Sequence, residues 1–378
     1  MKYDLIVRNG YLLDPATGNK GKHIVAVKDD KIADYSQDGQ AIQTINAKGC
    51  YVFPGLIDFH THIYEGSDFG VSPDLLLANG VTAAVDAGST GCVNFEMFYK
   101  NSMMNSKLKI KAFLNVSSIG QPGAGIDEPL DPKLFQKDLI RSLIRKYKGT
   151  ILGLKIRFSK NTVGGLGTKP LEETLKLAQE LGVPVCVHTT NPPIDAAELV
   201  SMLRKGDIYC HIYHGTGSTL LEEDGTIKPA FLDAAKRGVI FDCANGRFNL
   251  DYKVAKQSIS NKFLPDIIST DTTKVTLNVP AQVKSLPFVM SKYLSFGMSL
   301  EDVLKTVTVN PAKLMGMEGK IGTLKKGAYA DITICKIVDK KVVFSDSKGA
   351  THEGNQLIVP VLTIENGRIA YCQTDFNI

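Results

Sequence analysis

The pattern of apolar and polar positions divides the chain into two kinds of sequence. Residues 1–53 alternate apolar and polar positions in short runs such as residues 4–8, and turn-forming pairs such as Asn9-Gly10 interrupt these runs. Such alternation is typical of β-hairpins, because successive side chains of a strand point to opposite faces. The same alternation of apolar and polar positions in short runs is found from Ala330 to the end of the chain. We therefore expect residues 1–53 and 320–378 to form one small β-sandwich domain.

The middle of the chain, residues 54–319, alternates apolar, β-rich runs with amphipathic helical patterns. This is the pattern of βα units, whose parallel strands are buried on both faces. Eight strands within about 215 residues favour an α/β fold of the (β/α)8 TIM barrel type over an open doubly wound sheet. A dinucleotide fold is disfavoured, since no Gly-x-Gly-x-x-Gly follows the first strand. The predicted strands cover residues 56–62, 81–87, 110–116, 151–157, 183–188, 207–211, 239–243 and 267–270, and the predicted helices include residues 170–181, 194–205 and 300–306.

Composition and charge exclude several classes of protein. Hydrophobic residues make up 43% of the 378 positions and charged residues 22%, which are values of a globular protein and not of a disordered one. The net charge of +5 is spread over short basic runs with which aromatic residues do not interleave regularly, and this disfavours a nucleic-acid partner. No run approaches the roughly 18 apolar residues of a membrane span, and the first apolar run is too short for a signal peptide.

Seven cysteines form no Cys-x-x-Cys pair, which fits a reduced, cytoplasmic compartment. We therefore expect a cytoplasmic protein that acts on a small molecule, without a nucleic-acid or membrane partner. We also expect the chain to assemble as a homo-oligomer.

Residues able to bind a metal stand where several predicted strands end. The first strand ends in His60 and His62, whose side chains share a face because they lie two positions apart. The fifth strand ends in His188, the sixth in His211, and the eighth runs into Asp271. Functional groups of such barrels gather at the carboxyl ends of the strands. Each residue alone could be structural, but their common position predicts a metal site.

Lys155 lies inside the apolar run 151–157. A buried ammonium ion is costly, so this lysine either pairs with an acid or has a pKa low enough for the neutral amine to react with carbon dioxide. The resulting carbamate is an anion that can bridge two metal ions. In that second case, N6-carboxylated Lys155 would join His60, His62, His188, His211 and Asp271 in a site for two divalent metal ions, with zinc as the expected metal.

At these positions the chain resembles the amidohydrolase superfamily. The match covers nearly the whole chain, and its ordered set of His-x-His, Lys, His, His and Asp on strands one, four, five, six and eight is specific. The resemblance implies a metal-dependent hydrolase with a small β-sandwich built from both termini. Within the superfamily the chain is most similar to the dihydroorotase-like branch, which includes deacetylases of N-acetyl-D-amino acids and acetylated 2-hydroxy acids. The segments that carry the resemblance are residues 52–62, 153–157, 184–189, 210–215, 268–271 and 322–332.

Two departures from the family pattern concern the substrate. Dihydroorotase continues His-x-His with x-Arg, whereas Ile63-Tyr64 follows here, which disfavours that activity. The deacetylase branch usually has His-Cys-Phe-Asn-Gly after strand six and Gly-His-Gly after strand seven. This chain has His-Ile-Tyr-His-Gly at residues 211–215 and Ala-Asn-Gly-Arg at residues 244–247. The identity of the substrate therefore stays open.

The expected function is that of a metal-dependent amidohydrolase or deacetylase. Its substrate would be a small, carboxylated amide or ester, hydrolysed through a hydroxide that bridges the metals. Asp271 is the expected catalytic residue, which takes the proton of the attacking water and passes it to the leaving group. Arg157 lies two residues beyond Lys155 on the same face, where it could bind a substrate carboxylate or pair with an acid. His214 could contact the substrate or cap a loop.

Three alternatives remain. A cyclic amidohydrolase of the hydantoinase or dihydroorotase kind would keep the site and change the substrate. A purine deaminase is less favoured because of the bridging lysine. A non-catalytic binding or assembly module is the contrasting class, and the intact set of ligands argues against it.

Overall fold

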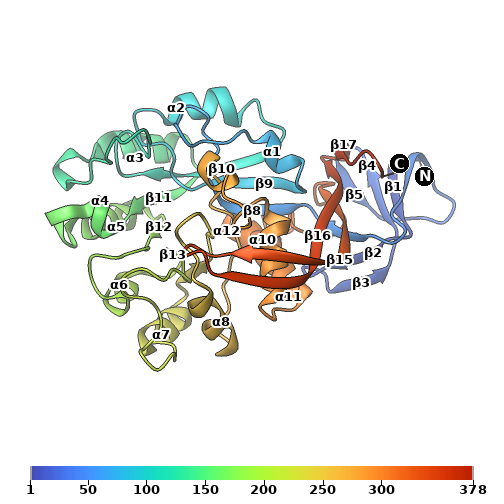
Figure 1. Ribbon diagram of the computed structural model, residues 1–378. Coiled ribbons are helices and arrows are strands. Elements are labelled where there is room, and N and C mark those ends of the chain that lie inside the picture. The colour runs from blue at the N-terminus through green and yellow to red at the C-terminus, as the bar shows by residue number, and fades with distance from the viewer. Residues whose placement is uncertain (1, 377–378) are drawn as a thin grey trace.

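The computed structural model describes residues 2–376, and a curled parallel sheet of seven strands forms the centre of this mixed α/β fold (Figure 1). Neighbours in the sequence are neighbours in the sheet, in the order β14-β13-β12-β11-β10-β9-β8. The carboxyl ends of all seven strands therefore meet at one edge of the curl. The strands are β8 (Leu56–Thr61), β9 (Val81–Asp86), β10 (Lys109–Asn115), β11 (Ile151–Arg157), β12 (Val185–His188), β13 (Ile208–Cys210) and β14 (Ile240–Asp242).

Helices surround the sheet on its outer face (Figure 1). The predicted helices 170–181, 194–205 and 300–306 correspond to α5, α6 and α11. None of the helices within residues 2–376 combines the length and the apolar character that crossing a bilayer requires. The helices are α1 (Asp74–Leu77), α2 (Phe95–Phe98), α3 (Lys137–Lys146), α4 (Lys160–Val163), α5 (Lys169–Leu181), α6 (Ala196–Met202), α7 (Pro229–Arg237), α8 (Tyr252–Ser260), α9 (Lys274–Leu277), α10 (Leu286–Ser295), α11 (Leu300–Thr306) and α12 (Val309–Leu314).

Local sequence explains the bounds of α5. Pro170 lies in its first turn, where the missing amide hydrogen costs nothing. Leu171 and Ala178 lie on one stripe and are buried against the sheet. Gly182 ends the helix with a φ of 65°, a conformation that glycine adopts without strain.

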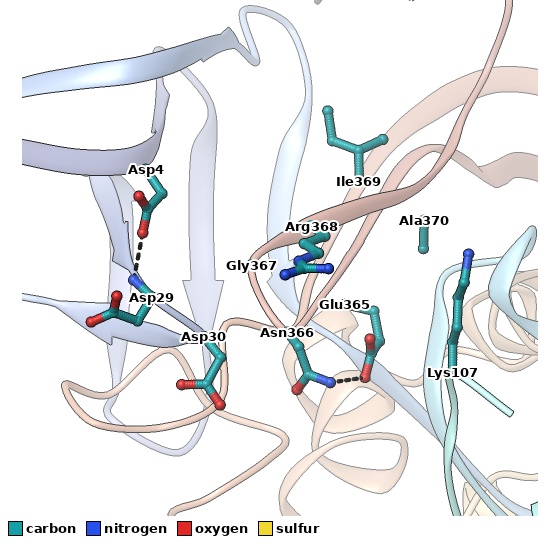
Figure 2. Close-up of a pocket in the computed structure, with 10 residues that line it drawn as sticks. All are labelled: Asp4, Asp29, Asp30, Lys107, Glu365, Asn366, Gly367, Arg368, Ile369 and Ala370. Carbon is teal, nitrogen blue, oxygen red and sulfur yellow. Dashed lines mark hydrogen bonds between the residues drawn. The ribbon is translucent and has the colours of Figure 1, made fainter. Parts of the chain in front are cut away.

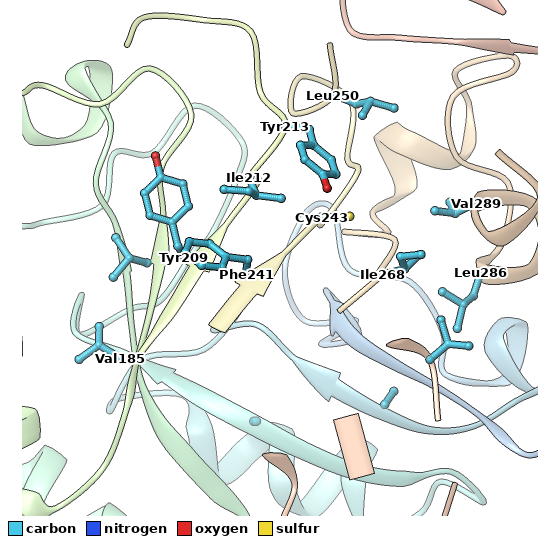
Figure 3. Packing of buried hydrophobic residues seen from close by; sticks show 14 of the residues in the cluster. Val185, Tyr209, Ile212, Tyr213, Phe241, Cys243, Leu250, Ile268, Leu286 and Val289 are labelled. Carbon is cyan, nitrogen blue, oxygen red and sulfur yellow. The ribbon is translucent and has the colours of Figure 1, made fainter. Parts of the chain in front are cut away.

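Alternation along the strands separates the outer core from the interior of the curl. Val185 of β12 and Tyr209 of β13 belong to the large apolar cluster between the sheet and its helices, part of which Figure 3 shows. Cys186 and Cys210, one position further along, belong to a separate buried cluster. His188 has the same parity as Cys186 and therefore faces the interior. The same alternation that builds the core thus directs the strand-end residues to one place.

The eighth predicted strand, residues 267–270, is not a regular strand. The segment between β14 and β8 forms one isolated bridge with each of them, and further backbone hydrogen bonds join it to the residues at their carboxyl ends. Within this segment the Asp58 carboxylate accepts hydrogen bonds from the Thr270 amide (3.1 Å) and hydroxyl (2.6 Å). The φ of Asp271 is 51°, outside the extended region. The structure therefore has seven regular strands in a half-barrel, with an irregular segment between its edges.

Strands from both ends of the chain lie together beside the central sheet (Figure 1). They form a four-stranded sheet in the order β5-β4-β1-β6 and a six-stranded sheet in the order β17-β16-β15-β7-β2-β3. Apolar residues of both sheets share one buried cluster, with Val27 and Ile45 from the first and Val52 and Ile332 from the second. The strands are β1 (Lys2–Arg8), β2 (Tyr11–Asp14), β3 (Asn19–Lys22), β4 (Val25–Lys28), β5 (Lys31–Ala33), β6 (Gln40–Asn46), β7 (Tyr51–Pro54), β15 (Ile332–Ser345), β16 (Thr351–Glu365) and β17 (Arg368–Cys372).

The hairpin of β15 and β16 extends beyond these sheets and packs on α10 (Figure 1). The rings of Phe344 and Phe288 are 5.0 Å apart between centroids. The Ile358 amide donates a hydrogen bond to the Ser291 hydroxyl at 2.9 Å. Part of residues 320–378 therefore packs on a helix of the central region. The apolar pattern of the hairpin alone does not predict this contact.

Candidate metal centre

His60 and His62 are held in tautomers that leave a free nitrogen. His60 Nδ1 lies 2.9 Å from Asp242 Oδ2 and donates its hydrogen to that carboxylate. His62 Nδ1 lies 2.8 Å from the Ser89 hydroxyl, which itself donates to Asp86 at 2.7 Å and must therefore accept from the histidine. In both rings the proton is on Nδ1, so that Nε2 carries a lone pair. This is the arrangement in which histidine binds a metal.

The Asp271 carboxylate lies opposite these two nitrogens. Its Oδ1 is 3.2 Å from His62 Nε2 and 3.7 Å from His60 Nε2, and His60 Nε2 is buried without a hydrogen-bond partner in the described chain. Lone pairs that face a carboxylate in a buried site are unfavourable unless a cation lies among them. Two imidazole nitrogens and one carboxylate within 4.8 Å of one another are ligands that divalent zinc accepts. These residues therefore fit a metal ion.

His211 and His188 extend the set of imidazoles. His211 Nδ1 donates to the Ala244 carbonyl at 2.8 Å, which again leaves Nε2 free. Its ring centroid is 5.3 Å from that of His60 and 4.4 Å from that of His188. The φ of His211 is 63°, so the chain turns sharply at the end of β13. The strand ends of β8, β12 and β13 thus bring histidines together, as the sequence predicts.

Burial determines the protonation of His60 and His211. It lowers the pKa of His60 well below its usual value and that of His211 to about 3. Burial by itself would raise the pKa of Asp271, but the net shift of that pKa is downward, which keeps the carboxylate ionised. Neutral imidazoles and an ionised carboxylate are the forms that bind metals. The site is therefore ready to bind cations without first losing protons from these groups.

Lys155 is buried beside this group, with its Nζ 3.6 Å from Cys186 Sγ. Gly88 makes room for it, since a Cβ at position 88 would lie 2.6 Å from the lysine side chain. Burial lowers the pKa of the amine, but Cys186, Cys210 and Asp271 raise it, and the net shift is upward. The neutral, carbamate-forming amine that the sequence suggests therefore stays a prediction.

The predicted ligands line one pocket of about 230 Å³ at the carboxyl edge of the sheet. Arg157 lines it too. His214 does not line it; it is buried, and neither of its ring nitrogens has a hydrogen-bond partner within the described chain. The full lining is His60, His62, Phe69, Gln121, Lys155, Arg157, His188, His211, Arg247, Phe248, Asn249, Asp271, Thr273, Val275 and Thr276.

Arg157 pairs with an acid that the sequence analysis missed. Its Nη1 donates to Glu128 Oε1 at 2.6 Å, and the Glu128 side chain is only 2% exposed. Burial raises the pKa of Glu128, although the positive charge of Arg157 opposes that effect. Of the two roles open to Arg157, pairing with an acid is the one that its contacts support.

Three further residues position the ligands and were also missed. Asp242 orients His60, Ser89 orients His62, and Asn249 donates to Asp271 Oδ2 at 2.9 Å. Asp242 lies in the predicted strand 239–243, so its place at a strand end could have identified it. Ser89 and Asn249 lie in loops without any local signal.

A larger cavity of about 860 Å³ lies among the terminal strands (Figure 2). Its lining carries carboxylates but no histidine or cysteine, and two of these carboxylates are already engaged. Asp4 accepts from the Asp29 amide at 2.5 Å, and Glu365 accepts from Lys109 at 2.7 Å. The cavity therefore lacks the mixed ligand set of the pocket at the strand ends. Its lining is Asp4, Asp29, Asp30, Lys107, Glu365, Asn366, Gly367, Arg368, Ile369 and Ala370.

Taken together, the curled parallel sheet and the convergent imidazoles are those of a metal-dependent hydrolase. Residues 51–367 match the amidohydrolase family. The chain belongs to this family, in its dihydroorotase-like branch, and is thus a hydrolase of carbon–nitrogen bonds.

Individual relatives and solved structures support the assignment to the amidohydrolase family. A deacetylase of Agrobacterium fabrum is 35% identical over 339 residues, which are 88% of this chain and 82% of that protein. A deacetylase of Enterococcus faecalis is 30% identical over 376 residues, 98% of this chain and 99% of that protein. Among solved structures, an adenine deaminase superposes with a TM-score of 0.89 at 30% identity over 97% of this chain and 99% of that chain. A dihydroorotase superposes with a TM-score of 0.87 at 30% identity over 98% of each chain.

Proposed function

We propose that this chain is a deacetylase that removes an acetyl group from a small, carboxylated amide or ester. The observation that carries the proposal is the convergence of the free His60 and His62 Nε2 atoms on the Asp271 carboxylate. The curated relatives in Agrobacterium fabrum and Enterococcus faecalis, both named deacetylases, support this reading over the alternatives.

In this proposal the pocket holds two divalent metal ions, with zinc as the preferred metal. Bound there, they supply the Lewis-acid chemistry that amide hydrolysis needs. Lys155 would be N6-carboxylated in the metal-loaded protein. The proposed ligands are the six residues His60, His62, Lys155, His188, His211 and Asp271.

Asp271 is the proposed general base. Its Oδ2 is occupied by the hydrogen bond from Asn249 (2.9 Å), which leaves Oδ1 to face the histidines and accept a proton. Asn249 is itself held by the Thr190 hydroxyl, which donates to Asn249 Oδ1 at 2.8 Å. The carboxylate is thus oriented before substrate binds. It would take the proton of the attacking water and pass it to the leaving nitrogen or oxygen.

We also propose a closed barrel and a separate sandwich domain for this chain. Residues 267–270 would serve as the eighth segment that closes a (β/α)8 barrel over residues 54–319. Residues 1–53 and 320–378 would form a β-sandwich domain. We further propose that the protein acts in the cytoplasm as a homo-oligomer.

A substrate screen on zinc-loaded protein tests the proposal. N-acetyl-D-amino acids and acetylated 2-hydroxy acids should be hydrolysed, whereas hydantoins, dihydroorotate and adenine should not. A chelator should remove the activity, and added zinc should restore it. His60→Asn should lose metal and activity, and His23→Asn, which changes an exposed histidine far from the pocket, should keep both. Full activity of metal-free protein, or turnover of adenine alone, would exclude the proposal.

A further inference from the structure

We propose that Arg247 recognises the substrate of this pocket by binding a carboxylate beside the scissile acyl bond. This inference rests on the proposed function and specifies the substrate class: N-acyl amino acids or 2-acyloxy acids with an apolar side chain. Four observations carry it: the position of Arg247, its unpaired charge, the pairing of Arg157 and the apolar wall around it.

The backbone before Arg247 packs directly against the proposed base. Gly246 has a φ of 51°, and a Cβ there would lie 2.3 Å from Asp271 Oδ2 and 2.5 Å from Asn249 Nδ2. The Gly246 amide donates to the Thr270 carbonyl at 3.0 Å, which ties this loop to the segment that bears Asp271. Arg247 therefore extends from a fixed point next to the reacting groups, and its side chain lines the pocket.

The charge of Arg247 is available to a ligand. Within residues 2–376 its guanidinium forms no ion pair and no hydrogen bond, and it lies over the Phe248 ring, with Cζ 4.9 Å from the ring centroid. Arg157, the other arginine of the pocket, is already neutralised by the buried Glu128. A free guanidinium presents a planar pair of donors that matches a carboxylate. Arg247 is therefore better suited than Arg157 to bind an anionic substrate.

Three apolar side chains line the pocket together with Arg247. Phe248 is 60% exposed and Val275 is 43% exposed, and both line the pocket. On the inner side, Phe69 packs against His62 with 5.6 Å between the ring centroids. A substrate with its carboxylate on Arg247 would bring its side chain against these surfaces, where an apolar or aromatic group loses contact with water.

The test compares a carboxylate with its neutral analogue. N-acetylphenylalanine and N-acetylphenylalaninamide, each as both enantiomers, are assayed with zinc-loaded, full-length enzyme. Arg247→Met should lower kcat/KM for the carboxylate by roughly 10- to 150-fold, the range expected for loss of a charge-assisted hydrogen bond, and should change kcat/KM for the amide by less than about 3-fold. Arg247→Lys should restore part of the loss, because it keeps the charge without the planar donor pair.

Two further variants are the controls. Arg157→Met should affect both substrates to a similar extent, because it leaves Glu128 buried without its partner. Arg8→Met changes an exposed arginine of β1, outside the pocket, and should match the wild type on both substrates. Equal losses on both substrates for Arg247→Met, or selectivity only in Arg157→Met, would overturn the inference.

Binding measurements separate this inference from the proposed function. If the wild type hydrolyses neither substrate, deacetylation of such compounds is wrong, and calorimetric titration of N-acetylphenylalanine and its amide then tests Arg247 directly. Tighter binding of the carboxylate that is lost in Arg247→Met would support the anion site without the activity. Equal binding of both compounds would overturn the anion site as well.

Discussion

Replacing Asp242 with asparagine tests how the protein sets the tautomer of a metal ligand. Asp242 Oδ1 accepts hydrogen bonds from the Ser269 hydroxyl and the Ala244 amide, and Oδ2 accepts from His60 Nδ1. Because the Ser269 hydroxyl and the Ala244 amide both donate to the Oδ1 position, the carbonyl oxygen of asparagine must occupy it. The NH2 group of asparagine must then take the Oδ2 position. There it faces the Nδ1 hydrogen of His60. Two donors cannot face each other, and the imidazole should move its proton to Nε2, the atom that faces Asp271.

The expected cost is a loss of metal affinity. A proton on Nε2 blocks the lone pair that binds the metal, and changes in such outer residues typically weaken metal binding by about 10- to 100-fold. That range corresponds to roughly 1.4 to 2.7 kcal/mol of binding free energy. Burial raises the pKa of Asp242 to about 6, so measurements at pH 8 compare an ionised aspartate with a neutral asparagine.

Competition with a chelator of known affinity measures the zinc dissociation constant of each variant. Asp331→Asn is the matched control, because Asp331 is equally buried but binds Lys109, at the amino-terminal end of β10, instead of a pocket residue. Circular dichroism establishes that each variant is folded. A folded Asp242→Asn protein that binds zinc within twofold of the wild type would refute the tautomer argument.

Three further predictions follow from buried groups. Lys155→Ala should lose bound metal and most activity, and short carboxylic acids should restore part of the rate; a variant with two metals and full rate, by elemental analysis and assay, would exclude the carbamate. Asp271→Asn should lower kcat by about 10² to 10⁴ as a general base is lost, and a rate within a few fold of wild type with metals retained would contradict that role. Lys292, whose Nζ donates to the Gln282 carbonyl at 2.7 Å, has a pKa that burial lowers to about 7. Between that pH and the usual lysine pKa of about 10.4, Lys292 carries a proton in the unfolded chain but not in the folded one. The free energy of unfolding of the wild type, compared with that of Lys292→Met, should therefore rise with pH, by up to about 1.4 kcal/mol per pH unit. Urea unfolding at several pH values measures this difference, and a difference that stays constant would show that Lys292 keeps its proton.

Local patterns are sufficient to predict the strands and the residues at their ends. The bounds of β11 are those predicted, residues 151–157, and the other six regular strands differ from their predictions by one or two residues at either end. Apolar runs and period-two alternation depend only on neighbouring residues, so they are visible in the sequence. For the same reason, the sequence alone assigns His60 and His62 to one face of their strand.

The features that the sequence analysis missed depend on contacts between residues that lie far apart in the sequence. Asp242 orients His60 across 182 positions, and Asp58 binds the irregular segment at Thr270 across 212 positions. The partner of Arg157, Glu128, is 29 positions away in a loop. No periodicity or spacing connects residues that far apart, because only the folded chain brings them within hydrogen-bond distance.

The two pocket arginines show most clearly which features the sequence determines and which features only the tertiary structure determines. From the sequence, strand alternation places Arg157 on the same face as Lys155 and makes it the candidate for a substrate carboxylate. The tertiary structure pairs its charge with Glu128 and leaves that of Arg247 unpaired in the described chain. The direction of a side chain in a strand follows from local geometry, and the sequence determines it. Whether its charge is already neutralised depends on which distant residue folds against it, and only the tertiary structure decides that.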